Sequence, residues 1–314
     1  MRVLRRLAAP SRPFARPVVA IGNFDGVHLG HRAIVERARA LAISLAGEVV
    51  AFTFHPHPVA RLAPERAPAQ VLSLAGRLRG LAALDVAGVV VAHFTRAFSC
   101  IEAGAFVEDV LVGGLGVAGV VVGHDLRYGH DRMGNAATMV EAGRARGFAV
   151  EVVEPILVGG ERVSSSAVRE ALETGQVERA ARLLGRPHRV RGRVRQGDRR
   201  GAGLGFPTAN LLPRGGMLPP DGVYAVSATV DGGALEFPAV ANLGTNPTFG
   251  GVARRLEVHL LDFSGDLYGR SLEVGFARRL RGEQRFGSVE DLVAQIGADV
   301  SAARACFAEG EPRP

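Results

Sequence analysis

The chain has 314 residues, which is enough for two domains that each bury a core of their own. Hydrophobic residues make up 47% and charged residues 22%, a balance typical of a soluble globular protein. No stretch approaches the roughly 20 apolar residues that a membrane-spanning helix needs, and residues 1–17 hold no run long enough for a signal-peptide core. We therefore expect a cytoplasmic protein with no membrane partner, in which the distant Cys100 and Cys306 stay reduced.

The formal net charge is +7, and every basic residue is arginine. The absence of lysine excludes a P-loop, whose GxxxxGK[ST] pattern needs an ammonium group against the phosphates. A basic chain favours anionic partners, which leaves nucleic acid, acidic lipid and small phosphates open. The densest basic run, His188–Arg200, contains no aromatic residue for base stacking, and its alternation predicts a strand with a solvated arginine face. We expect no nucleic-acid partner.

The first half of the chain alternates runs rich in β-branched residues with stretches of helical periodicity. The expected buried parallel strands are Pro17–Gly22, Glu48–Phe54, Gly88–Phe94, Val117–Gly123 and Phe148–Val153. The expected helices between them are His31–Ala46, Leu74–Leu84, Glu102–Leu111 and Asn135–Arg146. This alternation predicts a doubly wound α/β domain with a parallel sheet, which binds ligands beyond the carboxyl ends of its strands.

The second half begins after two short helices, about Ser166–Thr174 and Val177–Leu184. The breaker Gly185-Arg186-Pro187 follows, and we place the domain boundary there, with domains of residues 1–186 and 187–314. Glycine-punctuated strands are then expected at Arg189–Arg195, Gly222–Val230, Phe237–Leu243, Leu256–Asp262 and Leu272–Phe276. Strands at this spacing predict a small antiparallel β-barrel, and Ser288–Phe307 predicts a C-terminal helix that covers it.

The first candidate site is the turn between the strand that ends at Gly22 and the helix that follows. Glycines in such a turn let backbone N–H groups approach a phosphate, and the helix N-terminus adds its positive end. His28 and His31 can both face that phosphate and donate hydrogen bonds to charge that develops in a transition state. The alternative is a glycine-rich turn with two surface histidines. The full HxGH pattern after a strand favours the phosphate site.

A second segment of the first half supports this interpretation. Three hydroxyls, Ser164, Ser165 and Ser166, stand at an expected helix start between Arg162 and Arg169. Serine at such a place has an ordinary explanation as a helix cap. The same hydroxyls with Arg169 also form an anion site suited to the β and γ phosphates of ATP.

The second candidate site combines a glycine-rich loop with a strand carboxylate. The loop Gly197–Asn210 can fold over phosphates, and Thr208 and Asn210 offer hard oxygen ligands that suit Mg²⁺. The alternative is a flexible hairpin built from turn-forming residues. In Leu256–Asp262, apolar residues alternate with Glu257, which is either a general base or a carboxylate that faces solvent.

These motifs resemble a known family. HxGH with SSSxxR resembles the nucleotidylyltransferase superfamily. The fuller strings GNFDGVHLGH, TFHPHP and GHDLRYG, followed by GFPTAN, DGVY, NLGTNPTF, LEVHLLDF and RGEQRF, resemble the bifunctional riboflavin kinase/FMN adenylyltransferases over about residues 18–307. The resemblance implies ATP-dependent phosphorylation of riboflavin to FMN, then adenylylation of FMN to FAD with release of pyrophosphate.

The resemblance also implies roles for individual residues. In the first domain, ATP would be bound by Gly22, Phe24, Asp25, Gly26, His28, His31, Asp125, Arg162, Ser164, Ser165, Ser166 and Arg169, and the flavin by His57, Pro58 and Tyr128. In the second domain, ATP would be bound by Gly203, Gly205, Pro207, Thr208 and Asn210, with Mg²⁺ on Thr208 and Asn210. Arg281, Glu283 and Phe286 would contact the flavin there. The catalytic residues would be His28 and His31 in one site and Glu257 in the other.

Three other functions fit parts of the sequence. The first is a single-activity adenylyltransferase with a degenerate barrel, which the presence of the Mg²⁺ ligands and the base disfavours. The second is a regulator that binds FMN without turnover, and which would need neither Mg²⁺ nor groups for a phosphate leaving group. The third is an RNA-binding protein, whose RNA affinity would fall steeply with salt.

Overall fold

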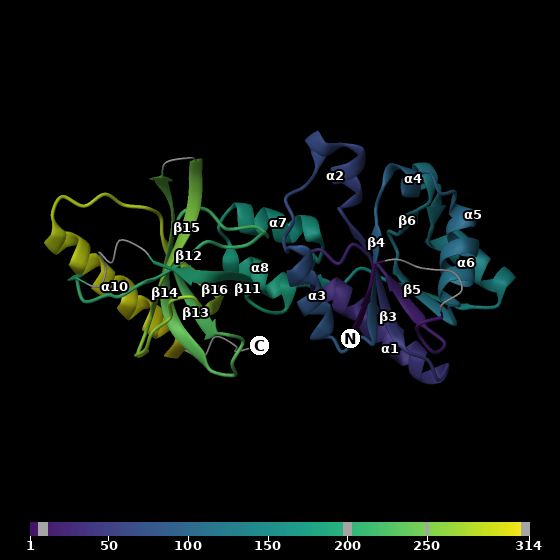
Figure 1. Ribbon diagram of the computed structural model, residues 1–314, viewed down its shortest axis with the longest axis horizontal. Coiled ribbons are helices and arrows are strands. Elements are labelled where there is room, and N and C mark those ends of the chain that lie inside the picture. Colours follow the sequence, from purple (N-terminus) through teal and green to yellow (C-terminus); the bar gives the residue numbers. More distant parts are fainter. Residues whose placement is uncertain (6–11, 197–202, 249–250, 309–314) are drawn as a thin grey trace. The chain divides into compact units, whose positions relative to one another are not determined.

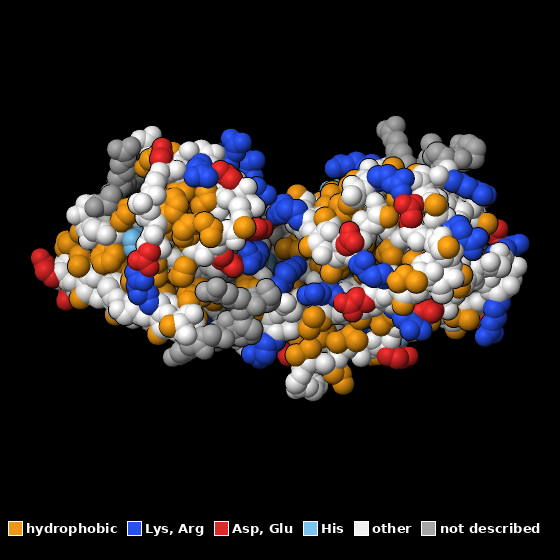
Figure 2. All heavy atoms as spheres, turned by 90° about the horizontal axis from the view of Figure 1, so that it is seen from below, with side chains coloured by type: hydrophobic (Ala, Val, Ile, Leu, Met, Phe, Trp, Pro, Cys, Tyr) orange, Lys and Arg blue, Asp and Glu red, His pale blue; other side chains and the backbone are white. Residues whose placement is uncertain are grey.

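The computed structural model describes residues 1–5, 12–196, 203–248 and 251–308 (Figure 1). It forms two compact units, Met1–Ser165 and Ser166–Pro314. On the face shown in Figure 2, arginine and acidic side chains are interleaved. Within the described ranges, every helix is too short or too polar to cross a bilayer.

The first unit is built on a six-stranded parallel sheet with the order β1-β4-β3-β2-β5-β8. The strands are β1 (Arg2–Leu4), β2 (Val18–Ile21), β3 (Val49–His55), β4 (Gly88–His93), β5 (Gly119–Gly123) and β8 (Ala149–Val153). The five predicted strands are confirmed. The edge strand β1 was not predicted, because three residues are too few to show a periodicity.

Helices cover both faces of this sheet, as expected for a doubly wound domain. They are α1 (Leu29–Ser44), α2 (Pro58–Leu62), α3 (Leu74–Ala82), α4 (Arg96–Ser99), α5 (Ala103–Ala105), the π-helix η2 (Phe106–Leu115) and α6 (Ala136–Arg146). Figure 1 shows α1 and α3 on one side of the sheet and α5 and α6 on the other. The helix predicted to end at Leu111 instead continues as η2 to Leu115, which is fully buried, and stops at the left-handed Gly116. Short hairpins pair β6 (Arg127–Tyr128) with β7 (Gly134–Asn135) and β9 (Leu157–Val158) with β10 (Glu161–Arg162).

The strand order creates one topological switch point at the carboxyl edge of this sheet. From β2 the chain continues through α1 to β3, whereas from β5 it continues to β8 on the opposite side. Neighbouring strands β2 and β5 therefore send their connections in opposite directions. Open α/β sheets bind ligands at such a switch point.

The second unit is a closed antiparallel barrel with the strand order β11-β12-β15-β14-β13-β16. The strands are β11 (His188–Arg195), β12 (Ala209–Leu211), β13 (Gly222–Val230), β14 (Glu236–Thr248), β15 (Gly251–Leu260) and β16 (Ser271–Arg281). Alternate residues of each strand fill the interior. In β11 the arginines alternate with buried residues, which confirms the predicted arginine face. The three-residue β12 was not predicted.

The C-terminal helix α10 (Val289–Ala308) covers the outside of the barrel, as predicted. Its Ala303 and Cys306 pack against Val223 and Ala225 of β13 and Val240 of β14. This contact explains why β13 is buried on both faces.

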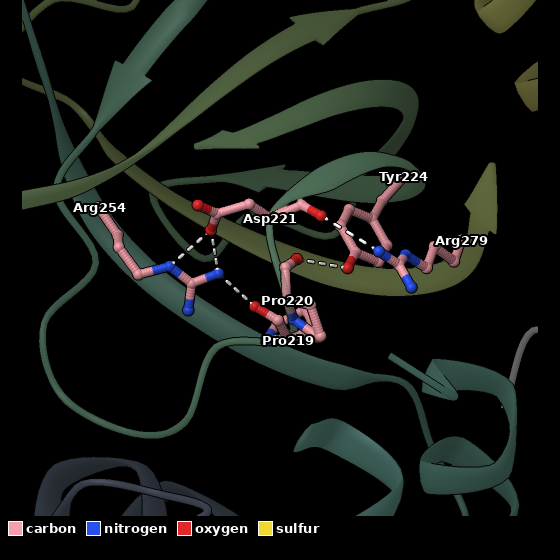
Figure 3. Close-up of polar contacts among 6 residues, drawn as sticks. All are labelled: Pro219, Pro220, Asp221, Tyr224, Arg254 and Arg279. Carbon is pink, nitrogen blue, oxygen red and sulfur yellow. Dashed lines mark hydrogen bonds and ion pairs between the residues drawn. The ribbon is translucent and has the colours of Figure 1, made fainter. Parts of the chain in front are cut away.

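A polar network holds the turn that leads into β13 (Figure 3). Arg254 of β15 donates through Nε to Asp221 Oδ1 at 2.8 Å, and Arg279 of β16 donates to the Asp221 carbonyl at 3.2 Å. Tyr224 is fully buried and donates its hydroxyl to the Pro220 carbonyl at 2.6 Å. Burial raises the pKa of Tyr224, so the hydroxyl keeps its proton for this hydrogen bond.

The two short helices predicted before the break are α7 (Ser165–Glu173) and α8 (Val177–Leu184). The division between the compact units falls between Ser165 and Ser166, so α8 groups with the barrel. Val177 of α8 is fully buried in the hydrophobic core of the barrel. The structural division thus comes before the break at Gly185-Arg186-Pro187, where the sequence places the domain boundary.

Val177→Ala should lower the free energy of unfolding of the barrel by about 2 kcal/mol, because it removes two buried methyl groups and leaves a small cavity. Hydrogen exchange read by mass spectrometry measures the change, since peptides of the barrel strands report their own opening. Val289→Ala, at an exposed position of α10, is the matched control and should change stability by less than about 0.5 kcal/mol. Faster exchange confined to residues 1–165 would contradict this assignment of α8.

Candidate active sites

The turn after β2 is buried and tightly wound. Phe24, Gly26 and Val27 have φ angles of 51°, 91° and 45°, all in the left-handed region. For the β-branched Val27 this conformation is a genuine outlier, and such strain is concentrated at functional sites. Phe24 and Val27 are at most 2% exposed, so the surrounding packing holds the turn in place.

His28 and His31 lie together where this turn enters α1. His28 caps the helix, because its Nδ1 accepts a hydrogen bond from the His31 N–H at 3.3 Å. The two rings stack with centroids 3.7 Å apart. Gly30 lies close beneath these rings, since a Cβ there would lie 3.2 Å from the His28 ring. The histidines are 6% and 9% exposed, so the alternative of two surface histidines is wrong.

The environment of His31 favours a neutral imidazole. Burial, then the neighbouring His28, then the Arg77 guanidinium hold the pKa of His31 well below its ordinary value. Its Nδ1 has no hydrogen-bond partner among the described residues. A neutral imidazole with an unused ring nitrogen at a helix N-terminus is suited to bind a phosphate oxygen.

Three other residues predicted for this site, Asp25, Ser165 and Gly22, hold the turn in place through hydrogen bonds. The Asp25 carboxylate accepts hydrogen bonds from the N–H groups of Val71 and Leu72, both at 3.1 Å. Ser165 donates its hydroxyl to the Asp25 carbonyl at 2.8 Å. Gly22 donates its N–H to the Phe52 carbonyl at 3.1 Å, which ties the end of β2 to β3.

A second polar group follows the neighbouring strand β5. Arg162 donates to Asp125 Oδ2 at 3.0 Å and lies 3.0 Å from His124 Nε2. Asp125 and Arg162 are exposed, so both can turn toward a ligand. We call the turn after β2 that carries His28 and His31 the histidine turn. Because β2 and β5 are adjacent, the cluster of Arg162, Asp125 and His124 and the histidine turn flank the switch point of the sheet.

The remaining predicted residues of the adenylyltransferase site are divided between the two units. His57 is 7% exposed and caps α2, where Pro58 is the first residue. Tyr128 packs in the sheet's hydrophobic core and lies 3.3 Å from the Thr138 hydroxyl. Ser164 is half-buried in the first unit, whereas Ser166 and Arg169 belong to the second, where Arg169 donates to the Ser166 hydroxyl at 3.4 Å.

In the barrel, strand register aligns the candidate kinase residues. Glu257 of β15 is paired with Asn210 of β12 on one side and with Asn242 of β14 on the other. The neighbours of Glu257 in its strand, Leu256 and Val258, fill the barrel core, so this row faces outward. Opposite residues of an antiparallel pair have Cβ atoms about 4.5–5.5 Å apart. The register therefore brings an amide, a carboxylate and a second amide together.

The row of paired residues continues to β16. Asn242 is paired with Val223 of β13, and Val223 with Arg281 of β16. We call these five residues, from Asn210 through Glu257, Asn242 and Val223 to Arg281, the outer rung. It joins the predicted phosphate ligand, the predicted base and one predicted flavin residue across five strands.

The glycine-rich loop reaches this rung from β12. Gly203, Gly205 and Pro207 are exposed and Thr208 is half-buried, whereas residues 197–202 lie outside the described part of the chain. His259, two residues after Glu257 on the same face, bonds through Nδ1 to the Pro207 carbonyl at 2.8 Å. Its ring also meets that of Phe206 at 5.6 Å, so β15 holds the end of the loop.

The predicted flavin residues follow at the end of β16. The Arg281 guanidinium binds the buried Asp299 of α10 through three hydrogen bonds of 2.8–3.1 Å. The same guanidinium lies 5.7 Å from the centre of the Phe286 ring. Glu283 is exposed, and a Cβ at Gly244 of β14 would lie 2.7 Å from its Oε1. Arg281 thus joins the rung to the covering helix.

Three residues that bear on these sites were not singled out from the sequence. Arg77 contacts the histidine turn, His259 holds the glycine-rich loop and Asp299 binds Arg281. Each lies in a helix or strand where charged or polar residues are ordinary. The spacing of Asp299 from Ala303 and Cys306, and of Arg77 from Leu74 and Leu81, places both charges on the buried side of their helices, which is the one signal that the sequence offered.

Comparison with known proteins agrees with this division of the molecule. Residues 12–167 match the family model described as FAD synthetase, and residues 184–307 match the model described as riboflavin kinase. A protein named bifunctional riboflavin kinase/FMN adenylyltransferase from Pseudomonas fluorescens is 44% identical over 96% of this chain and 97% of its own. Relatives with the same name from Escherichia coli K12 and Bacillus subtilis are 41% and 35% identical over 94% and 91% of this chain and 94% and 90% of their own.

The fold is also found in a solved structure. A structure described as a macrolide-efflux protein from Streptococcus pneumoniae superposes with a TM-score of 0.85 at 29% identity, over 97% of this chain and 99% of the other. The relatives match both units and nearly the full length of the chain. The chain belongs to the bifunctional riboflavin kinase/FMN adenylyltransferase family.

Proposed function

We propose that this chain carries the two activities of its family in two separate sites, one in each unit. The chain phosphorylates riboflavin to FMN with ATP and then adenylylates FMN to FAD with release of pyrophosphate. The observation that supports the proposal best is that each unit assembles its own polar cluster, the histidine turn in the sheet and the outer rung in the barrel.

In the first unit, the histidine turn would serve adenylyl transfer. The FMN phosphate is already a nucleophile, so this step needs no catalytic base. The site must instead stabilise the charge that develops on the pyrophosphate leaving group, which His28 and His31 can do from a helix N-terminus. ATP would also be bound by Gly22, Phe24, Asp25, Gly26, Asp125, Arg162, Ser164, Ser165, Ser166 and Arg169, and the flavin by His57, Pro58 and Tyr128.

In the barrel, the outer rung would serve phosphoryl transfer. A primary alcohol of riboflavin must attack the γ-phosphorus of ATP in line, and positioning with charge neutralisation supplies most of the acceleration. Glu257 would accept or orient the hydroxyl proton. ATP would lie along Gly203, Gly205, Pro207, Thr208 and Asn210, and the flavin near Arg281, Glu283 and Phe286.

The residues around Glu257 fit a magnesium ion that arrives with ATP. Mg²⁺ prefers hard oxygen ligands and is usually held by one or two protein groups together with substrate phosphates. Asn210, paired with Glu257, and Thr208, two residues earlier, carry such oxygens. The ion would neutralise charge on the transferred phosphoryl group, while Thr208 and Asn210 orient the nucleotide.

Two further points belong to the proposal. The functional boundary lies at Gly185-Arg186-Pro187, next to the start of the range 184–307 that the riboflavin kinase model matches. The reactions take place in the cytoplasm, which is supported by the exposed free thiol of Cys100, since such thiols are typical of a reducing compartment.

His31→Ala should reduce FAD formation by about 10²–10³-fold, because it removes one donor to the leaving group. The same protein should still form FMN from riboflavin, since the barrel is untouched. Chromatographic separation of the flavins measures both steps in one reaction with MgATP. His130→Ala, in the same unit but away from the turn, is the matched control and should leave both rates unchanged. If the His31→Ala protein makes FAD at the wild-type rate, the assignment of the histidine turn to the adenylyltransferase site is wrong.

Glu257→Gln should give the opposite result, with FMN formation lost and FAD still formed from supplied FMN. The amide keeps the size of the side chain but cannot take a proton at neutral pH. Initial rates with riboflavin and with FMN as substrate separate the two steps. Glu273→Gln, on strand β16 of the same barrel but off the outer rung, should phosphorylate riboflavin normally. If the Glu257→Gln protein phosphorylates riboflavin normally, Glu257 is a carboxylate that faces solvent and is not the general base.

A further inference from the structure

Arg77 of α3 is a buried charge to which no role has yet been assigned. It is 1% exposed and is among the largest fully buried side chains in the described part of the chain. Arginine is almost never buried to this extent unless its charge and its donors are paired. Its partners therefore indicate what it is there to hold.

The guanidinium binds the carboxyl ends of two adjacent parallel strands. Nη1 donates to the carbonyl of Asn23, just after β2, at 2.7 Å, and Nη2 donates to the carbonyl of Phe54, near the end of β3, at 3.2 Å. Thr53 supports the same point, since its hydroxyl donates to the Asn23 carbonyl at 3.0 Å and lies 3.3 Å from Arg77 Nη1. A planar fork can bind two carbonyls in this way, whereas a single ammonium group cannot reproduce the geometry.

The turn binds α3 in return. Asp25 accepts from the N–H groups of Val71 and Leu72, immediately before this helix. Gly80 of α3 approaches Val27 so closely that a Cβ would lie 2.9 Å from its Cγ2. Hydrogen bonds thus run in both directions between α3 and the turn that carries His28 and His31.

We propose that Arg77 is a positioning residue for adenylyl transfer, which fixes the histidine turn by holding the carbonyls of Asn23 and Phe54. The inference rests on the role proposed above for His31. Arg77 touches neither substrate in this account and acts through the turn.

The charge of Arg77 also acts on His31, which gives a second observable for the role. Burial first, then His28 and Arg77, lower the pKa of His31, and Asp25 is the carboxylate that interacts with Arg77 itself. Arg77 also lowers the pKa of His55 at the end of β3, after burial and ahead of Arg5 and His93. Removing the cation makes the imidazolium form of His31 less unfavourable, so the pKa of His31 must rise.

Two variants separate the effect of the planar guanidinium group, with its two donors, from the effect of its charge. Arg77→Lys keeps the charge but loses the paired donors that bind the Asn23 and Phe54 carbonyls. FAD formation should therefore fall about tenfold, while His31 titrates as in the wild type. Arg77→Met loses both, so FAD formation should fall about 10²-fold, the size of effect that a small misplacement of catalytic groups produces. In that variant the pKa of His31 should move up toward its ordinary value. NMR titration of the histidines follows this shift, with the His31 signal assigned by its loss in His31→Ala.

Controls distinguish positioning from simple unfolding. Arg79→Met, an exposed arginine on the same helix, should leave the rate of FAD formation and the titration unchanged. Hydrogen exchange of residues 12–165 reports whether each variant is folded, and riboflavin phosphorylation by the same chain reports the barrel. If Arg77→Met does not fold, Arg77→Lys decides the question, and a wild-type rate of FAD formation in that variant would overturn the proposal.

The result also separates this inference from the proposed function. A folded Arg77→Met protein with normal FAD formation and an unchanged His31 titration would refute the positioning role, provided that His31→Ala is inactive. If His31→Ala itself forms FAD normally, the proposed site is wrong regardless of Arg77.

Discussion

The first unit depends on a pair of opposite charges buried between α3 and the turn after β2. Asp25 binds the backbone before α3, and Arg77 binds the backbone after β2. A buried charge without partners would cost several kcal/mol, so the Asp25 carboxylate and the two Nη groups of Arg77 find their partners only when the turn and the helix are in register. The left-handed residues of the turn and the stacked His28 and His31 follow from that arrangement. The proposed phosphate site at the N-terminus of α1 is thus held by hydrogen bonds between the turn and α3.

The barrel positions its candidate site residues in a different way. Its outer rung is set by strand register, because each strand that contributes to it also carries apolar residues into the closed core. Shifting β15 by one residue would bury Glu257 and expose Leu256, so the core itself enforces the register. The pairing of Arg281 with Asp299 then ties the far end of the rung to α10. The candidate site of the first unit is therefore held by two buried charges of opposite sign. That of the barrel is held by the alternation of buried and outward-facing residues along its strands.

Much of this organisation follows from the sequence, and the exceptions have physical causes. The parallel strands are buried on both faces, so continuous apolar runs such as Val18–Ile21 mark them clearly. The strands β1 and β12 have three residues each and take their conformation from their neighbours. The HxGH and LEVHLLDF motifs predicted the placement of His31 and Glu257, because turn chemistry and alternation are local. Arg77 and the association of α8 with the barrel depend on contacts between distant parts of the chain, which no local pattern reveals.

The central claim is that one chain holds two sites that work independently, linked only by the FMN that passes between them. Mixing the His31→Ala and Glu257→Gln proteins tests it most directly, with riboflavin and MgATP as substrates and chromatography of the flavins as the readout. Each protein alone should make little FAD from riboflavin, at most about a hundredth of the wild-type rate. The mixture should accumulate FAD, because FMN released by one protein is adenylylated by the other. A mixture in which FMN accumulates but FAD never forms would contradict the account.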